Sequence, residues 1–261
     1  TALRSDLKAI ICQKPFCRNL VEAEQIAAAA ADAGIVLIIH ENFRFQPWYQ
    51  IMKDQLESGQ VGTPYQFRFS LRPNDGRGPQ AYLSRQPYFQ TMKRFLVHET
   101  AIHFLDVFTY LFGRPTTVYA DLQRRNPAIA GEDAGHILLG YEDGRRAVFD
   151  GNRLADHEAD NHRLTMGEAV LEGSEASLTL NGFGEVWRRR NGTTNNELLL
   201  ARQDWPGFGG DCVYTLIQHI LRCLESGETP ANTAAEYLRL LDVEELVYKS
   251  AATGQRLAVQ E

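Results

Sequence analysis

KAIICQKPFCRNLVEAEQIAAAAADAGIVLIIHENFRFQP, residues 8–47, decides the first part of the fold. Lys8–Cys12 is a short apolar run, and Ile35–Ile39 is an unbroken run of β-branched residues and leucine, typical of a strand covered on both faces. Between them, Asn19 can cap a helix whose apolar residues repeat with a helical period and which ends at Gly34. Strand, helix and strand in this order predict a unit of a parallel α/β sheet.

Polar residues follow both predicted strands at the point where each strand ends. Gln13-Lys14-Pro15 follows the first strand, and a stretch containing Asn42 and Arg44 follows the second. In open α/β sheets, ligands bind outside the carboxyl ends of the strands, so these side chains are candidates for one site. The alternative interpretations are a surface lysine in a turn closed by proline, and a solvated loop after the second strand.

The remainder of the chain predicts a different architecture. Tyr65–Leu71 alternates apolar and polar residues, as a half-buried strand does, and a strongly apolar helix is expected over about Thr100–Phe112. Short runs separated by turn residues follow and predict an antiparallel meander. These runs are Thr116–Leu122, Gly135–Tyr141, Ala147–Asn152, His162–Leu171, Ser177–Leu180 and Glu185–Arg189. Two helices finish the chain, the second opening with Thr233 and Glu236 at the spacing of a capping box.

These patterns predict an α+β fold: a predominantly antiparallel open sheet with helices on one face, preceded by the remnant of a parallel α/β domain. A parallel sheet of only two strands would leave apolar edges exposed, so the first part is expected to be incomplete. We expect two units, residues 1–47 and residues 48–261, with the last helix (about 233–253) packing back on the first unit.

A third cluster of polar residues lies at the start of the apolar helix. Glu99 and His103 are four residues apart and share one helix face, and Asp106 lies three residues further on, within reach of His103. A histidine oriented by a carboxylate is a competent general base near neutral pH. The alternative is a buried histidine whose hydrogen bonds are satisfied. No metal site is expected, because His98 and His103 have the wrong spacing for two ligands on one helix face.

Composition argues against several classes of function. The net charge is −6, whereas a nucleic-acid-binding protein usually has a basic face, so no nucleic-acid partner is expected. No apolar run approaches the roughly 18 residues that span a bilayer, so no membrane partner is expected either. The four cysteines lack the paired CxxC spacing, which favours reduced thiols and a cytoplasmic location.

Taken in order, these motifs resemble the Gfo/Idh/MocA family of oxidoreductases. Lys14-Pro15 stands at a strand end, an Asn-x-Arg-Phe-x-Pro motif begins at Asn42 one βα unit later, and Glu99 precedes His103 by four residues. Two later stretches also match the family's pattern, residues 171–180 and 227–254. The resemblance therefore covers the whole chain, and it implies that the parallel α/β part belongs to a Rossmann domain.

The resemblance also implies roles for three of these residues. Lys14 matches the family's lysine between the nicotinamide and the reacting hydroxyl, and His103 matches the histidine that accepts the hydroxyl proton. Glu99 matches an aspartate that binds a neighbouring substrate hydroxyl. Gln13 replaces an acidic residue of the family, and Ala101 stands where glycine is common. These departures, like the longer side chain of Glu99, bear on the substrate more than on the fold.

By the same resemblance, Lys14, Pro15 and Asn42 contact the cofactor, NAD or NADP, while Arg44 and Asn42 join Glu99 on the substrate side. The family begins with a Gly-x-Gly-x-x-Gly turn that cradles the cofactor phosphates, and no such turn occurs in this sequence. We therefore expect three βα steps of about 25–30 residues each, roughly 80 residues, to be missing before the first predicted strand.

The expected function is that of a truncated oxidoreductase that transfers a hydride between NAD(P) and a secondary alcohol of a sugar or polyol. The alternative is a non-catalytic sugar-binding or dimerising module derived from such an enzyme. Helices are available for only one face of the predicted meander. The other face is therefore expected to be buried between the subunits of a homo-dimer or tetramer.

Overall fold

The structure is a computed structural model that describes residues 7–17 and 19–260; residues 1–6 and 18 of the predicted first unit lie outside the described residues. Its first elements are β1 (Ala9–Gln13), α1 (Leu20–Asp32) and β2 (Val36–His40). β1 and β2 pair in parallel over their whole length. The side chain of Asn19 accepts a hydrogen bond of 3.0 Å from the Glu22 amide. The predicted strand, helix and strand, and the helix cap, are confirmed.

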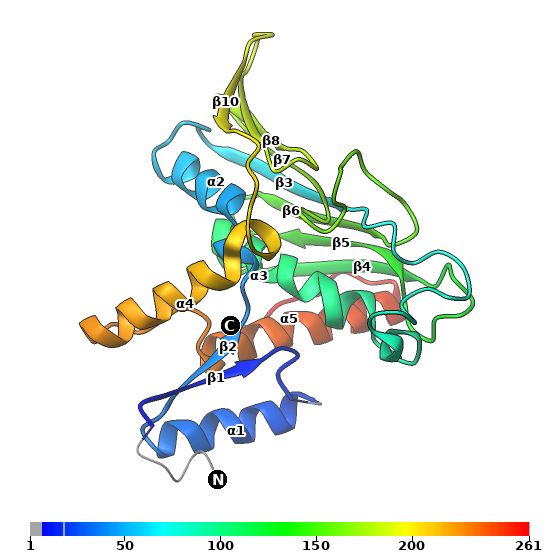
Figure 1. The fold of residues 1–261 in the computed structure, drawn as a ribbon, viewed down its shortest axis with the longest axis vertical. Helices are drawn as coiled ribbons and strands as arrows, with labels where there is room; N and C mark the ends of the chain where they lie inside the picture. The colour runs from blue at the N-terminus through cyan, green and yellow to red at the C-terminus, as the bar shows by residue number, and fades with distance from the viewer. Residues whose placement is uncertain (1–6, 18, 261) are drawn as a thin grey trace.

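The other strands of the described residues form one sheet in the order β10-β9-β8-β7-β3-β6-β5-β4-β11 (Figure 1). They are β3 (Pro64–Leu71), β4 (Thr117–Gln123), β5 (Ala134–Gly140), β6 (Arg146–Asn152), β7 (Gly167–Gly173), β8 (Ala176–Leu180), β9 (Val186–Arg190), β10 (Asn196–Leu200) and β11 (Leu257–Ala258). The remaining α-helices are α2 (Pro47–Glu57), α3 (Ile102–Phe112), α4 (Phe208–Ser226) and α5 (Ala234–Thr253). The fold is thus α+β, with a large and mostly antiparallel sheet.

The sheet differs from the predicted meander in three places. β3 lies in its middle and pairs in parallel with β6, which the long connection through α3, β4 and β5 allows. β7 begins at Gly167 rather than His162, because the preceding residues form turns and Met166 has a left-handed φ of 61°. β10 and β11 are not among the predicted strands. β10 is largely exposed and β11 has two residues, so neither has a clear alternating pattern.

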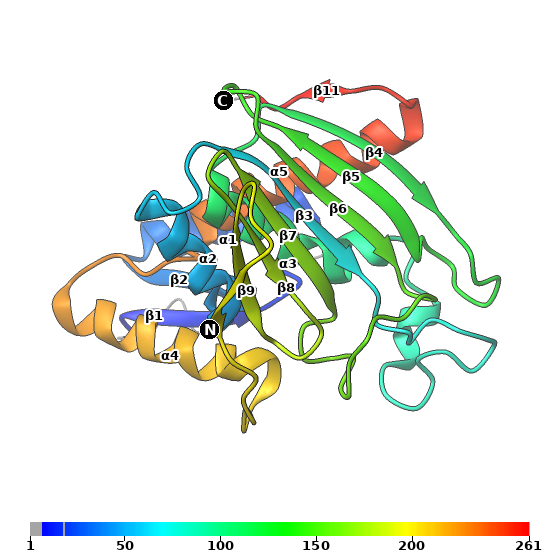
Figure 2. The same ribbon diagram turned by 90° about the horizontal axis from the view of Figure 1, so that it is seen from above.

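Helices α2, α3 and α5 cover one face of the large sheet, and Figure 2 shows the opposite face without a described helix over it. Between the layers, aromatic side chains make the core: the ring of Phe69 on β3 stacks on Phe104 of α3 with centroids 3.9 Å apart. Burying each such side chain stabilises the fold by about 1.5–3 kcal/mol. On the open face, Tyr119 and Leu138 are 39% and 36% exposed. The sheet therefore has one packed face and one solvent-facing face.

Helices α4 and α5 join the parallel pair to the rest of the molecule. The amide of Ile39 donates to the carbonyl of Asn232 at 2.8 Å, so the segment before α5 lies along the edge of β2 that β1 does not use. α5 also packs against α1, and α4 packs Cys212 and Leu216 near Ile38 of β2. The division into two units and the Rossmann assignment stay predictions.

In the part of the chain that the structure describes, no helix is long and apolar enough to cross a membrane.

Candidate active site

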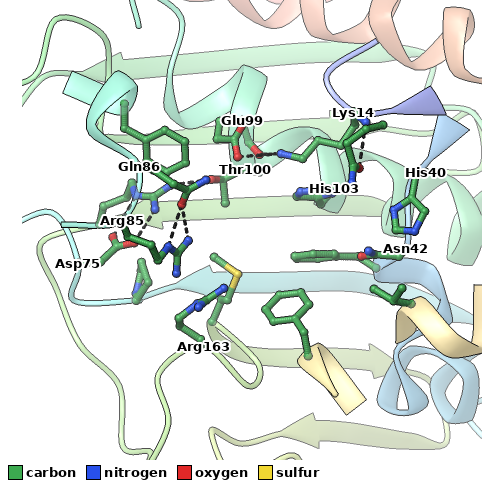
Figure 3. Close-up of a pocket in the computed structure, with 18 residues that line it drawn as sticks. Lys14, His40, Asn42, Asp75, Arg85, Gln86, Glu99, Thr100, His103 and Arg163 are labelled. Carbon is green, nitrogen blue, oxygen red and sulfur yellow. Dashed lines mark hydrogen bonds and ion pairs between the residues drawn. The ribbon is translucent and has the colours of Figure 1, made fainter. Parts of the chain in front are cut away.

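A cavity of about 240 Å³ lies where the carboxyl ends of β1 and β2 meet the large sheet and the start of α3 (Figure 3). Four residues that the sequence predicts for one site line it together: Lys14, Asn42, Glu99 and His103. The other polar side chains in its wall are Gln13, His40, Asp75, Arg85, Gln86, Thr100, Arg153 and Arg163. The structure thus gathers the ends of two strands and one helix around a single space.

Lys14 and Asn42 reach this cavity because β1 and β2 end at the same edge. The parallel ladder stays in register to the last residue of each strand, so the residues that follow emerge side by side. After β2 the chain forms a 3₁₀ turn, Phe43–Phe45, before α2 begins. Pro15, which follows Lys14 through a cis peptide bond, is exposed and does not line the cavity.

Glu99 lies on a π-helical turn, Leu96–Ala101, that leads into α3. Such turns are rare and occur frequently at functional sites. The carboxylate of Glu132 accepts hydrogen bonds from the amides of Phe95 and Val97, at 3.0 and 3.2 Å, and so satisfies donors at the start of the turn. The predicted apolar helix is confirmed as α3, and the π-helical turn before it, which was not predicted, is capped by a carboxylate from a distant loop.

Lys14 forms an ion pair with Glu99, with Nζ 2.9 Å from Oε1, and Nζ also donates to the backbone carbonyl of Glu99 at 2.7 Å. An ammonium group has three N–H donors, so one remains for a ligand in the cavity. On the other side of the same turn, the buried Arg153 donates to Thr100 Oγ1 at 2.6 Å and pairs with Asp75. The π-helical turn is thus held from both sides while Glu99 faces the cavity.

His103 is oriented by Glu41 and not by Asp106, which corrects the prediction from sequence spacing. Nδ1 of His103 lies 2.7 Å from both carboxylate oxygens of Glu41. Asp106 instead binds the guanidinium of Arg44, whose planar fork matches a carboxylate better than one ring nitrogen does. An ionised Glu41 requires a proton on Nδ1, so Nε2 is left as the acceptor for a group in the cavity.

Electrostatics favours the ionised form of Glu41, and packing fixes the plane of the His103 ring. Burial opposes ionisation of Glu41, but the nearby His103 and Lys14 outweigh it and lower the pKa of the Glu41 carboxyl below its usual range. The ring of Phe43 stacks on His103 with centroids 4.0 Å apart and an angle of 6° between the planes. The imidazole therefore has a set plane and tautomer, and a charge balanced by Glu41 if Nε2 accepts a proton.

Arg44 is predicted on the substrate side, and the structure contradicts this. It is buried beside α3, where Nε donates to Asp106 at 2.8 Å and Nη1 lies 3.0 Å from Glu236 Oε1. It does not line the cavity of Lys14. A 3₁₀ turn rotates the chain by about a third of a circle per residue, so Asn42 and Arg44, two residues apart, point in different directions.

Several lining or supporting residues are absent from the sequence prediction. Glu41 directly precedes the motif that begins at Asn42, and a carboxylate directly after a predicted strand is the one signal that could have found it. The others lie on loops or helix ends far along the chain, with no local pattern to mark them: Asp75, Arg85, Arg153, Arg163 and Phe208. Across residues 7–17 and 19–260, no group of three His, Cys, Asp or Glu side chains is arranged to hold a metal ion.

Comparison with known proteins identifies relatives of the chain. The family model described as the GFO/IDH/MocA C-terminal domain matches residues 49–179. The D-apiose dehydrogenase of Paraburkholderia graminis is 32% identical over 257 residues, a match that covers 97% of this chain and 67% of that protein. The D-apiose dehydrogenase of Rhizobium rhizogenes is 31% identical over 255 residues, covering 95% of this chain and 72% of that protein.

A solved structure has the same fold. It is an oxidoreductase from Agrobacterium radiobacter in complex with NAD+, L-tartaric acid and magnesium, and it matches with a TM-score of 0.81. Its sequence is 29% identical, and the match covers 95% of this chain and 72% of that one. The family model spans half of the chain, and the two dehydrogenases match nearly all of it. The chain therefore belongs to the Gfo/Idh/MocA family of NAD(P)-dependent oxidoreductases.

Proposed function

We propose that the protein transfers a hydride between a nicotinamide cofactor and a secondary alcohol of a sugar or polyol. The observation that supports this most is the convergence of Lys14, Glu99 and His103 on one cavity at the carboxyl ends of two parallel strands. Ligands of open α/β sheets bind at that edge. A cation, a carboxylate and an oriented imidazole are suited to holding and deprotonating a hydroxyl group.

In this proposal His103 is the general base. Its Nε2 accepts the proton of the reacting hydroxyl, and Glu41 balances the charge that the ring gains. The free N–H of Lys14 donates to the same hydroxyl oxygen and stabilises the negative charge that develops there. Glu99 accepts a hydrogen bond from a neighbouring hydroxyl of the substrate. In the reverse reaction His103 returns the proton to the carbonyl oxygen.

The ends of β1 and β2 fit the nicotinamide end of NAD or NADP, which when bound supplies the hydride acceptor. Asn42 Oδ1 and His40 Nδ1 are buried without a hydrogen-bond partner among the described residues, and both side chains line the cavity. Buried polar atoms normally have partners, so a polar ligand group at this point would satisfy them. We therefore assign Lys14 and Asn42 to the cofactor side, whereas Pro15, which the sequence also predicts there, lies outside the cavity wall.

A sugar or polyol is the proposed substrate because the two relatives are named for a sugar and most of the residues that line the cavity are polar. Asn42 and Glu99 are the groups proposed to bind its hydroxyls. NAD is the first cofactor to test, because the Agrobacterium structure is a complex with NAD+.

A non-catalytic sugar-binding module is the second candidate. It needs only the substrate side of the cavity, where Lys14 and Glu99 keep hydrogen-bonding groups free for sugar hydroxyls. Both candidates imply sugar binding, but only the first implies turnover with a nicotinamide.

Oxidation of a sugar panel that includes D-apiose, with NAD+ and separately with NADP+, distinguishes the two. The formation of reduced nicotinamide is followed by its absorbance. Turnover of at least one sugar, and its loss in Lys14→Met, is the result expected for the oxidoreductase. Sugar binding by calorimetry without turnover by either nucleotide would assign the module instead.

We also propose that the open face of the large sheet is buried between subunits of a homo-dimer or tetramer. Apolar residues lie in one cross-strand row on this face, including Tyr119, Leu138 and Val148. Exposed apolar patches of this kind mark protein interfaces. Light scattering at micromolar concentration should give more than one subunit, and Leu138→Arg should give monomers. Leu224→Arg, at a position on α4 that is 37% exposed against 36% for Leu138, is the control, and a wild-type monomer would contradict the proposal.

A further inference from the structure

Charged side chains divide the cavity into two ends. At the end near β1 and β2 they are paired with opposite charges, as Lys14 is with Glu99. At the other end, Arg85 and Arg163 line the wall. Figure 3 shows these two side chains on the same side of the view, away from Lys14. The two ends therefore offer a ligand different chemistry.

Neither of the two arginines has an acidic partner. In the described part of the chain, no carboxylate lies within ion-pair distance of either guanidinium; the carboxylate in this wall, Asp75, pairs with a different and buried arginine. Arg85 donates to the side-chain oxygen of Gln86 at 3.0 Å, and the guanidinium of Arg163 lies 5.5 Å from the ring centroid of Phe208. Both guanidinium groups keep N–H donors for a ligand.

The cavity is also more positive than the molecule around it. Its wall contains four lysine or arginine side chains and two carboxylates, a formal charge of +2, whereas the whole chain has −6. Burial lowers the pKa of Arg163 and the neighbouring charge of Arg85 lowers it further, although the charge of Asp75 acts in the opposite direction. Two like charges held together in a concave site of an acidic protein favour a ligand of the opposite sign.

We propose that the substrate has an anionic group, a carboxylate or a phosphate, which Arg85 and Arg163 bind at the end of the cavity opposite Lys14. The inference rests on the proposed function, because it specifies the substrate of the same site. Planar guanidinium groups donate paired hydrogen bonds to either anion. The nicotinamide fits at the other end, beside Asn42, so this anion belongs to the substrate. Holding it fixes which hydroxyl lies between Lys14 and His103.

Calorimetry on the full 261-residue chain tests this with three matched pairs of probes. These are D-gluconate with D-glucitol, D-galacturonate with D-galactose, and D-glucose 6-phosphate with D-glucose. At least one anion should bind about tenfold or more tightly than its neutral counterpart, and added salt should reduce the difference. The pair with the largest ratio tells whether the site takes a carboxylate or a phosphate.

Arg85→Gln and Arg163→Gln should each weaken binding of that anion about ten- to a hundredfold, the effect expected for hydrogen bonds to a charged group. Binding of the neutral counterpart should change little. Arg190→Gln removes an exposed arginine from β9, outside the cavity, and is the matched control. Thermal melting of each variant checks that the fold is kept.

Two results would overturn the inference: no anion binds more tightly than its neutral counterpart, or the preference survives in the double variant. Oxidation of a neutral sugar alone, with NAD+ or NADP+, would leave the proposed function standing without this refinement. If the anion binds through both arginines but no sugar is oxidised, the anion site stands and the proposed oxidoreductase function fails.

Discussion

Two ion pairs connect the residues after β1 and β2 to α3 and to the π-helical turn before it, and they differ in the hydrogen-bonding groups that they leave free. In Arg44–Asp106 the guanidinium binds the carboxylate through Nε and Nη2, and the side chains are 9% and 3% exposed. In Lys14–Glu99 the side chains are nearly as buried, at 13% and 12%, and both line the cavity of His103, whereas Arg44 and Asp106 line a different cavity. Burial alone therefore does not separate a structural ion pair from one that meets a ligand.

The difference lies in the donors and acceptors that remain. Every nitrogen of the Arg44 guanidinium has a carboxylate partner, Asp106 at Nε and Nη2 and Glu236 at Nη1, and in this sense the pair is closed. Lys14 gives Glu99 two of its three donors, and Glu99 keeps one carboxylate oxygen free of the pair. An ion pair with unused groups at a cavity can bind substrate, whereas a closed pair can only hold elements together. Four substitutions test this comparison.

The largest expected effect is on turnover, when His103, which lines the same cavity as Lys14, is replaced. His103→Ala should lower kcat about 10²- to 10⁴-fold in the nicotinamide-linked reaction, the usual contribution of a general base. Thermal melting together with active-site titration separates this from loss of fold. If His103 is only a buried structural histidine, the melting temperature will fall while the folded fraction keeps a nearly normal kcat.

Breaking the closed pair should act on stability instead. Asp106→Asn leaves the buried Arg44 without its main counter-charge and should cost about 3–5 kcal/mol of unfolding free energy. Denaturant unfolding measures this, and kcat of the folded fraction should stay within a few-fold of normal. Asp121→Asn, at an exposed position on β4, is the control. A large loss of kcat with unchanged stability in Asp106→Asn would mean that the Arg44–Asp106 pair serves turnover and is not structural.

Breaking the open pair should act on turnover. Lys14→Met should lower kcat about 10²- to 10³-fold, as expected when one donor to a developing negative charge is removed. Its effect on stability should be smaller than that of Asp106→Asn, because Glu99 borders the open cavity. Lys53→Met on α2, which removes an ion pair with Glu57, provides the matched control. Equal losses of stability in the Lys14 and Asp106 variants would mean that both pairs are structural.

The smallest effect is expected at Glu99, where Asp restores the residue common in the family. Because Glu99→Asp keeps the charge but withdraws it by one methylene, KM should change by up to about tenfold and kcat by less. The ratio of kcat/KM values for two substrates measures the preference among sugars. A loss of kcat as large as that of Lys14→Met would instead make Glu99 part of the proton-transfer step.

Sequence by itself was enough for the features that depend on near neighbours. The cap at Asn19, the parallel pair β1–β2 and most strands of the large sheet follow from capping residues and apolar periodicity within short windows. The position of Lys14 at a strand end and the four-residue spacing of Glu99 and His103 are of the same kind. Each of these features is set by interactions within a few residues along the chain.

Only the tertiary structure decided which side chains contact one another at the site. Glu41 rather than Asp106 orients His103, across 62 residues of sequence, and Arg44 turns away from the cavity at a 3₁₀ turn. Arg85 and Arg163 enter the same cavity from loops that no local pattern links. The physical reason is that a side chain's contacts depend on the direction in which its backbone turns and on what long-range packing brings opposite it. Neither is encoded in the spacing of residues along a single segment.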